Sequence, residues 1–219
     1  MTTIVNPSYR QRIGYQAGLL GGFAMVAAAL LTMGNIATHS AIAERHAEDL
    51  RSSLQQVIPA SLYDNDLLAA VIELPGPHEE PIEVYRALRG LEVTALAFPV
   101  SEPGYAGPIQ LMLGLDASGQ ILGVRVLAHT ETPGLGDKIE VARDDWILSF
   151  NGLSLHNPPP ERWAVKKDGG QFDQFSGATI TPRAVVKAVH GGLEWFTEHR
   201  DSLTASAVIQ QEPTHGDSD

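Results

Sequence analysis

Two short segments gather glycines and polar side chains of the kinds that bind and attach ligands. The first, residues 131–138, reads Glu-Thr-Pro-Gly-Leu-Gly-Asp-Lys and follows an apolar run. The second, residues 173–181, reads Asp-Gln-Phe-Ser-Gly-Ala-Thr-Ile-Thr and precedes a helical pattern. Glycine lets a ligand come close to the backbone, and the hydroxyls of the second segment offer points of attachment. These two segments form the candidate site.

Neither segment identifies its ligand from its residue types alone. Gly134-x-Gly136 matches the start of a dinucleotide fingerprint, but Ile139 stands where the third glycine belongs and no βαβ unit surrounds it. A plain tight turn and a turn that contacts a planar ligand both fit this segment. The start of a helix after the second segment would attract an anionic phosphate, while an ordinary capped helix start also explains its residues.

The second segment carries a recognisable motif, Asp173-x-x-Ser176-Gly177-Ala178-Thr179. It resembles the flavinylation motif of the FMN-binding domain family, in which a flavin transferase joins FMN to the last Thr through a phosphodiester. The resemblance implies covalent FMN on Thr179. It further implies that the flavin has these neighbours: Asp173, Ser176, Gly177, Ala178, Thr181, Glu131, Thr132, Gly134, Leu135 and Lys166.

A longer part of the chain, about residues 10–195, resembles one branch of that family. Residues 105–109, 129–136 and 163–170 are similar to the G subunit of the Rnf-type (Rsx) ion-translocating electron-transport complexes. In those complexes, electron flow between ferredoxin and NAD is coupled to ion movement, and a second covalent FMN is attached to another membrane subunit. The resemblance implies an electron-transfer subunit with these partners and no catalytic residue of its own.

Three other functions remain open from the sequence. The C subunit of the sodium-pumping NADH:quinone reductase shares the motif, although Asp137-Lys138 and residues 166–170 favour the Rnf branch. A membrane-tethered module that holds a small ligand non-covalently is a second alternative. A structural anchor without cofactor is the third. A covalent flavin would distinguish an electron-transfer subunit from the binding module and the anchor. Denaturation removes a loosely held ligand but not an esterified flavin.

Composition excludes several kinds of site. The chain contains no cysteine, which rules out thiolate-bound zinc, iron–sulfur clusters and disulfides. Its histidines show no paired metal-ligand spacing, so no metal site is expected. Arg10 and Arg12 are the only Lys, Arg, Asp or Glu residues among the first 43, so the remainder carries 13 basic and 26 acidic side chains. A surface this acidic repels nucleic acid.

The N-terminal part predicts a membrane anchor. Residues 13–43 lack Asp, Glu, Lys and Arg, and the apolar window 17–36 is long enough to cross the ~30 Å hydrocarbon core of a bilayer. Basic residues precede this window and acidic residues follow it. The positive-inside rule therefore predicts a cytoplasmic N-terminus and export of the residues after about 40. Together with the resemblance, this implies a single-pass protein of the bacterial inner membrane with a periplasmic FMN domain. A signal peptide cleaved after Ala41-Ile42-Ala43 is the alternative.

The remaining pattern predicts a small α+β domain with an antiparallel sheet and flanking helices. Periodicity indicates a helix over 40–75, a linker over 74–81, and strands over 91–100, 108–116, 121–128 and 163–167. Residues 145–150 fit a short helix or strand. Thr181 as N-cap and Pro182 at N1 predict the start of a last helix, whose apolar stripe is Val185, Val189, Leu193 and Phe196.

These elements divide the chain into five expected parts. They are a cytoplasmic N-terminus (1–12), a transmembrane helix (13–37), a helical stalk and linker (38–82), the FMN-binding domain (83–202) and a polar tail (203–219). The membrane helix and stalk are expected to contact partner subunits.

Overall fold

A computed structural model describes residues 13–76 and 80–205, which divide into two compact units between Asp49 and Leu50. Helix α1 runs over Ile13–Val57. Within it, Ile13–Asn35 is long and apolar enough to cross a membrane, with a mean hydropathy of 1.8 over its most apolar window. None of that window is buried within the protein, so its Leu, Phe and Met side chains have no protein core to pack into. A lipid environment would satisfy them.

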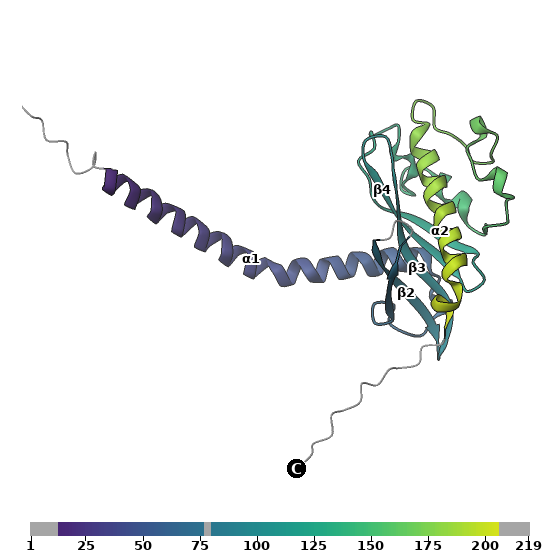
Figure 1. Cartoon of the computed structure of the whole chain (residues 1–219), viewed down its shortest axis with the longest axis horizontal. Coiled ribbons are helices and arrows are strands. Elements are labelled where there is room, and N and C mark those ends of the chain that lie inside the picture. The colour runs from purple at the N-terminus through teal and green to yellow at the C-terminus, as the bar shows by residue number, and fades with distance from the viewer. Residues whose placement is uncertain (1–12, 77–79, 206–219) are drawn as a thin grey trace, which may run out of the picture. The chain divides into compact units, whose positions relative to one another are not determined.

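The second unit is built on one antiparallel sheet whose five strands follow their order in the chain (Figure 1). Each strand pairs with the next, so hairpins make every connection. The strands are β1 (Val71–Pro75), β2 (Pro81–Arg89), β3 (Glu92–Pro103), β4 (Pro108–Asp116) and β5 (Ile121–Ala128). The predicted fold class is confirmed.

Helix α2 (Ile180–Thr204) covers one face of this sheet (Figure 1). Alternation along β3 directs Leu96, Phe98 and Val100 into this core, while Ala95 and Ala97 belong to the core of the opposite face. The predicted stripe of α2, from Val185 to Phe196, is buried there. Burial of this stripe, and not helix propensity alone, holds α2 in place.

The opposite face of the sheet packs against the end of α1. Leu54, Val57 and Ile58 are buried there together with small Ala side chains of β2 and β3. Gly114 and Gly123 pair across β4 and β5, and a Cβ added at Gly114 would lie 2.6 Å from the Val57 carbonyl oxygen. These two glycines let the helix backbone lie directly on the strands.

Residues 129–179 connect β5 to α2 without a further strand. This connection contains the 3-10 helices η3 (Asp137–Ile139), η4 (Asp145–Phe150), η5 (Pro160–Arg162) and η6 (Lys166–Asp168). Another 3-10 helix, η2 (Ala60–Leu62), lies before the sheet. Phe150 stacks on Phe172, with ring centroids 4.6 Å apart, and Trp146 packs edge-on to Phe150. This aromatic cluster gives the connection a fixed path to the start of α2.

Several predicted elements agree with the structure. The strands predicted over 108–116 and 121–128 have the predicted ends, and the one predicted over 91–100 extends to Pro103. Residues 145–150 are helical, and Asp144 caps them because its side chain accepts a hydrogen bond from the Trp146 N–H at 2.9 Å.

Two predictions before the sheet are wrong. The helix predicted over 40–75 ends at Val57, and its last part is strand β1. The segment predicted as a linker is the end of a hairpin, in which the Gly76 N–H donates to the Glu80 carbonyl oxygen at 2.8 Å. Residues 77–79 at its centre lie outside the described part. As a result, the sheet begins before residue 83, where the FMN domain was expected to start.

Two predictions near the C-terminal helix are also wrong. Residues 163–167 form no strand, because the chain folds back at Gly169 and Gly170 and leaves only an isolated bridge between Val165 and Phe172. The N-cap of α2 is Thr179 and not Thr181, whose hydroxyl group is engaged elsewhere. The expected N-terminal segment 1–12 and most of the tail 203–219 lie outside the described residues.

Candidate functional site

The structure brings the two glycine-rich segments together beside the start of α2. The Thr181 hydroxyl donates a short hydrogen bond to Glu131 Oε2, and both side chains are buried. A Cβ added at Gly177 would lie 3.6 Å from Leu135 Cδ2. Segments that lie far apart in the sequence therefore meet at one place, as a shared ligand site requires.

The second oxygen of the Glu131 carboxylate holds the tip of the β3–β4 hairpin. Glu131 Oε1 accepts hydrogen bonds from the backbone N–H groups of Tyr105 at 2.9 Å and Ala106 at 3.0 Å. A Cβ at Gly104 would lie only 2.6 Å from this oxygen. One buried carboxylate thus ties together the hairpin tip, the turn at 131–136 and the first turn of α2.

His129 fixes the start of the same turn. Its Nδ1 accepts a hydrogen bond from the Glu131 N–H at 3.0 Å, and its Nε2 lies 2.7 Å from Glu140 Oε1. Because Nδ1 is the acceptor, Nε2 carries the proton and donates to Glu140. The histidine therefore orients the turn and is not a metal ligand in this arrangement.

The turn itself is closed by backbone and side-chain bonds. The Thr132 carbonyl oxygen accepts from the N–H groups of Leu135 and Gly136, at 3.1 and 3.0 Å, and Asp137 Oδ1 accepts from the Gly134 N–H at 2.8 Å. Gly134 has φ +78°, which favours glycine, and a Cβ there would touch nothing. Thr132, Gly134 and Leu135 are exposed, so this turn presents an open surface.

Gly136 is needed for a different reason. A Cβ at this position would lie 2.8 Å from Glu131 Cβ and 3.0 Å from Thr181 Oγ1. Its φ of −92° is accessible to any residue. Close packing of the turn against α2, and not backbone conformation, therefore requires glycine here.

Thr179 lies where the chain enters α2, half-buried and with its hydroxyl group making no capping bond. Before it, Gly177 adopts φ +81°, and the Ala178 N–H donates to the Phe175 carbonyl oxygen at 3.2 Å. After it come the N–H groups of the first helical turn, which lack intrahelical acceptors. A hydroxyl beside such groups suits a phosphate ester, because they and the helix dipole stabilise its negative charge.

Two ion pairs hold η6 next to the motif and to the first turn of α2. Lys166 Nζ lies 2.6 Å from Asp173 Oδ1, so two residues expected near the flavin contact each other. Arg183, in the first turn of α2, donates to both Asp168 oxygens at 2.6 and 2.7 Å. The hydrogen bond from Arg183 holds the pKa of Asp168 below its usual range.

A cavity of about 540 Å³ opens beside the motif. Asp173, Ser176 and Lys138 line it together with residues of η4. The indole N–H of Trp146 donates to the Asp173 carbonyl oxygen at 2.8 Å and so forms part of its wall. This hollow borders the segment that carries Thr179.

Sequence reasoning assigned no role in the site to several residues that organise it. They are Gly104, the backbone N–H groups of Tyr105 and Ala106, His129, Asp137 and the Asp168–Arg183 pair. The spacing His129-x-Glu131 was a usable signal, because it lets the imidazole accept from the Glu131 N–H. The others depend on contacts between distant segments, which one sequence does not reveal. Among the side chains that the structure describes, no group of His, Asp and Glu is arranged to hold a metal ion.

Comparison with known proteins places this site in a family. The model of the FMN-binding domain matches residues 104–194, which include both glycine-rich segments. The chain is 54% identical to the G subunit of the ion-translocating oxidoreductase complex of Cereibacter sphaeroides, with 88% of each chain covered. It is 53% identical to the G subunit of Stutzerimonas stutzeri (86% of this chain, 82% of that one) and 43% identical to that of Shewanella loihica (93% and 100%).

Two solved structures are also similar. One is the crystal structure of Shewanella oneidensis NqrC, which is 23% identical, with a TM-score of 0.46 and coverage of 67% of this chain and 77% of that one. The other is the C subunit of the Na(+)-translocating NADH-quinone reductase from Parabacteroides distasonis, which is 21% identical, with a TM-score of 0.43 and coverage of 62% and 68%.

Proposed function

This chain belongs to the family formed by the G subunits of the ion-translocating oxidoreductase complexes, and from that premise we propose that it transfers electrons through FMN bound covalently to Thr179. The complex is of the Rnf type, coupling electron flow between ferredoxin and NAD to ion movement. The chain itself neither binds NAD nor moves ions. Its redox centre is the flavin, held in the periplasm by a domain anchored through α1.

The observation that carries this proposal is the position of Thr179. It lies between Gly177, which has a left-handed backbone and lies next to Leu135, and the first turn of a 25-residue helix. Its hydroxyl group makes no cap bond. A phosphate attached to it would meet the N–H groups of the helix start, while Leu135 and the open turn at Gly134 lie close enough to support an attached aromatic ring.

Attachment is a phosphoryl transfer without change of oxidation state. The Thr179 Oγ–H bond is replaced by an Oγ–P bond, and a phosphoanhydride bond breaks in a flavin dinucleotide donor. A nucleoside monophosphate leaves, and a base on the transferase takes the hydroxyl proton. Among the described residues, no basic side chain is hydrogen-bonded to the Thr179 hydroxyl, which supports a separate transferase as catalyst.

When bound, the flavin supplies one- and two-electron chemistry, and the protein positions it. Glu131 holds the turn, the helix start and the hairpin tip in one arrangement. Lys166 and Asp173 neutralise each other beside the motif, which limits the charge that faces the phosphate. The partners we propose are the other subunits of the complex, above all the membrane subunit that holds another covalent FMN.

The proposal is tested by expressing the full chain with a flavin transferase and viewing a denaturing gel under ultraviolet light. We expect a fluorescent band for the natural chain and for Ser202→Ala, which removes an exposed hydroxyl outside the motif, and no band for Thr179→Ala. Dark lanes for all three in a host with an active transferase would overturn the covalent assignment and favour a non-covalent binding module.

A further inference from the structure

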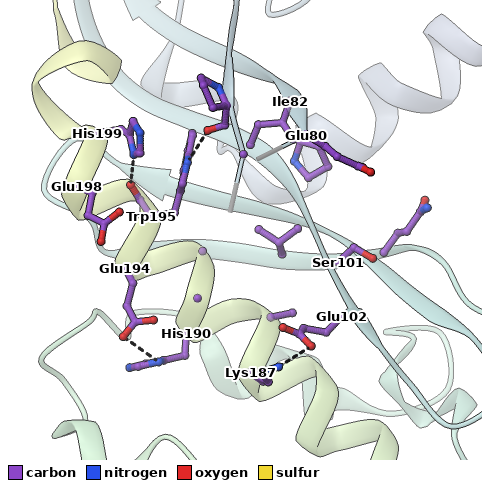
Figure 2. Close-up of a pocket in the computed structure, with 18 residues that line it drawn as sticks. Glu80, Ile82, Ser101, Glu102, Lys187, His190, Glu194, Trp195, Glu198 and His199 are labelled. Carbon is purple, nitrogen blue, oxygen red and sulfur yellow. Dashed lines mark hydrogen bonds and ion pairs between the residues drawn. The ribbon is translucent and has the colours of Figure 1, made fainter. Parts of the chain in front are cut away.

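A second cavity, of about 810 Å³, lies away from the flavinylation motif, between α2 and the β1–β2 hairpin (Figure 2). Residues of β3, including Pro99 and Val100, form its floor. The side of α2 from Lys187 to His199 forms one wall, and the hairpin from Pro75 to Ile82 forms the other. We refer to this cavity as the α2 groove.

The α2 groove combines an apolar floor with an acidic rim. Its lining includes the carboxylates of Glu80, Glu102, Glu194 and Glu198 but a single Lys or Arg side chain, Lys187. That lysine is already paired with Glu102, at 3.0 Å (Figure 2). Glu194 lies 3.7 Å from His190 Nδ1, and among the described residues no lysine or arginine pairs with Glu80, Glu194 or Glu198 (Figure 2). The rim therefore carries more carboxylates than lysine and arginine side chains.

The shape of the groove depends on a pair of glycines in α2. Gly192 lies against the sheet, where a Cβ would lie 2.8 Å from Leu113 Cδ2 and 3.0 Å from Val100 Cγ1. Gly191 has nothing within 4 Å of its Cβ position and lines the cavity. The first glycine lets α2 pack closely on the sheet, and the second leaves the groove open where a side chain would narrow it.

From this charge and shape we propose that the α2 groove binds a basic segment, bearing Lys or Arg, of a partner subunit. The apolar floor accepts the aliphatic stems of such residues while the rim carboxylates pair with their heads. The inference rests on the proposed function only in requiring that the chain works within a complex.

Other occupants fit the charge less well. The last residues of this chain, 206–219, contain Glu212, Asp217 and Asp219 and neither Lys nor Arg. A second copy would bring together two units that are each strongly acidic, with 26 acidic and 13 basic side chains beyond residue 43. A free anion would face the same repulsion. A basic segment of a different protein is the occupant that complements the groove.

The location gives such docking a use in electron transfer. Lys187, at the near end of the groove, lies about eight residues from Thr179, or about 12 Å along the helix at about 1.5 Å per residue. A partner in the groove is thus held by the same rigid helix that begins at the flavin-bearing residue. Helix α2 would keep the partner at a fixed distance from the flavin.

The experiment is site-specific photo-cross-linking in the whole complex, expressed with its flavin transferase. A photoreactive benzoylphenylalanine replaces Gln110, an exposed side chain that already lines the groove, and the cross-linked peptides are identified by mass spectrometry. We expect cross-links to a peptide of another subunit that has at least two Lys or Arg residues. Cross-links to lipid, to a second copy of this chain or to a segment without basic residues would overturn the proposal, as would their absence in an assembled complex.

A second experiment reverses the charge of the rim and measures the yield of the same cross-link. The pair Glu194→Lys and Glu198→Lys should lower the cross-link yield at least tenfold. Glu92→Lys with Glu161→Lys makes the same change in net charge at exposed positions outside the groove and should leave the yield unchanged. Equal yields from both double variants would contradict the proposal. Flavin fluorescence on a denaturing gel reports the attachment at Thr179 separately, so either proposal can fail while the other holds.

Discussion

Glu131 illustrates how a buried charge can organise a site without entering its chemistry. Both of its oxygens are occupied by donors from the protein, namely two backbone N–H groups of the hairpin tip and the Thr181 hydroxyl. A carboxylate that accepts several hydrogen bonds in a buried place is strongly held. The resemblance predicted Glu131 beside the flavin ring. Its contacts support a role in positioning the turn at 131–136, which is proposed to face the ring.

Replacing this carboxylate should loosen three segments at once. We expect Glu131→Ala to destabilise the domain by about 2–4 kcal/mol, because buried donors lose their acceptor. Glu131→Gln, which keeps one carbonyl oxygen and the shape, should cost clearly less. Urea unfolding of the anchored protein in detergent, followed by tryptophan fluorescence, measures both. Equal midpoints for natural chain and Glu131→Ala would show that these hydrogen bonds contribute nothing.

Some site residues could be recognised in the sequence, whereas the roles of others depend on the fold. The motif around Thr179 was recognisable because its residues are contiguous. Gly136 was seen as part of a turn, but its reason, the 3.0 Å approach of a Cβ to Thr181 Oγ1, needs the fold. Thr181 was predicted as a helix cap from its place before Pro182. Its hydroxyl instead reaches Glu131, a contact between distant parts of the chain.

Helix α2 connects Thr179, the proposed attachment residue, to the core. Its apolar stripe fixes it on the sheet, and the Arg183–Asp168 pair fixes its first turn to η6. Because Arg183 stabilises the charged carboxylate, the pKa of Asp168 is lower in the folded chain than in the unfolded one. The pair thus stabilises the fold fully above the ordinary Asp pKa of about 4, and this contribution is lost as the pH falls through the depressed value.

The lowered pKa of Asp168 predicts how the stability of the domain depends on pH. Asp168→Asn should unfold at lower urea concentration than the natural chain at pH 7, and the gap should close as the pH falls below about 4. Urea midpoints measured from pH 7 down to pH 3 check it, with Asp145→Asn, an exposed carboxylate away from Arg183, as the matched control. A gap that stays constant over this range would mean that the charge of Asp168 is not what stabilises the pair.

The elements predicted well are those with strong local signals. The strands over 108–116 and 121–128 alternate and are joined by a turn in which Gly119 has φ +91°. The wrong predictions of secondary structure arose where the local sequence pattern and the contacts in the folded domain favour different structures. Proline and glycine near residue 76 suggested a linker but close a hairpin, and the apolar run near Val165 suggested a strand but folds back at two glycines.

For the whole molecule, the sequence predicted an anchor, an α+β domain and the family. The relatives at 43–54% identity confirm the family, and the structure confirms the fold class. Helix α1 contains a segment with the length and composition of a membrane span. Its orientation is a prediction from the charges at its two ends. The end of the first helix was predicted too late, although Pro59, two residues beyond Val57, marks it in the sequence because proline interrupts helical hydrogen bonding.

The absence of cysteine makes the orientation simple to test. A single Glu161→Cys, on the exposed helix η5, should react with a membrane-impermeant maleimide in intact spheroplasts. Ser8→Cys should react only after the membrane is permeabilised, because the N-terminus is expected to be cytoplasmic. The reverse pattern would place the domain in the cytoplasm and leave the flavin outside the periplasm. Retention of the Ser8 residue in the mature chain would also exclude cleavage after Ala43.

The covalent flavin is tested most directly by the mass of one peptide. Trypsin should cut after Lys167 and Arg183 and release residues 168–183, which contain Thr179 together with Ser176 and Thr181. In protein made with an active transferase, this peptide should be heavier by the mass of FMN less one water, and fragmentation should assign that mass to Thr179. An unmodified peptide, or the same mass on another residue, would contradict the account.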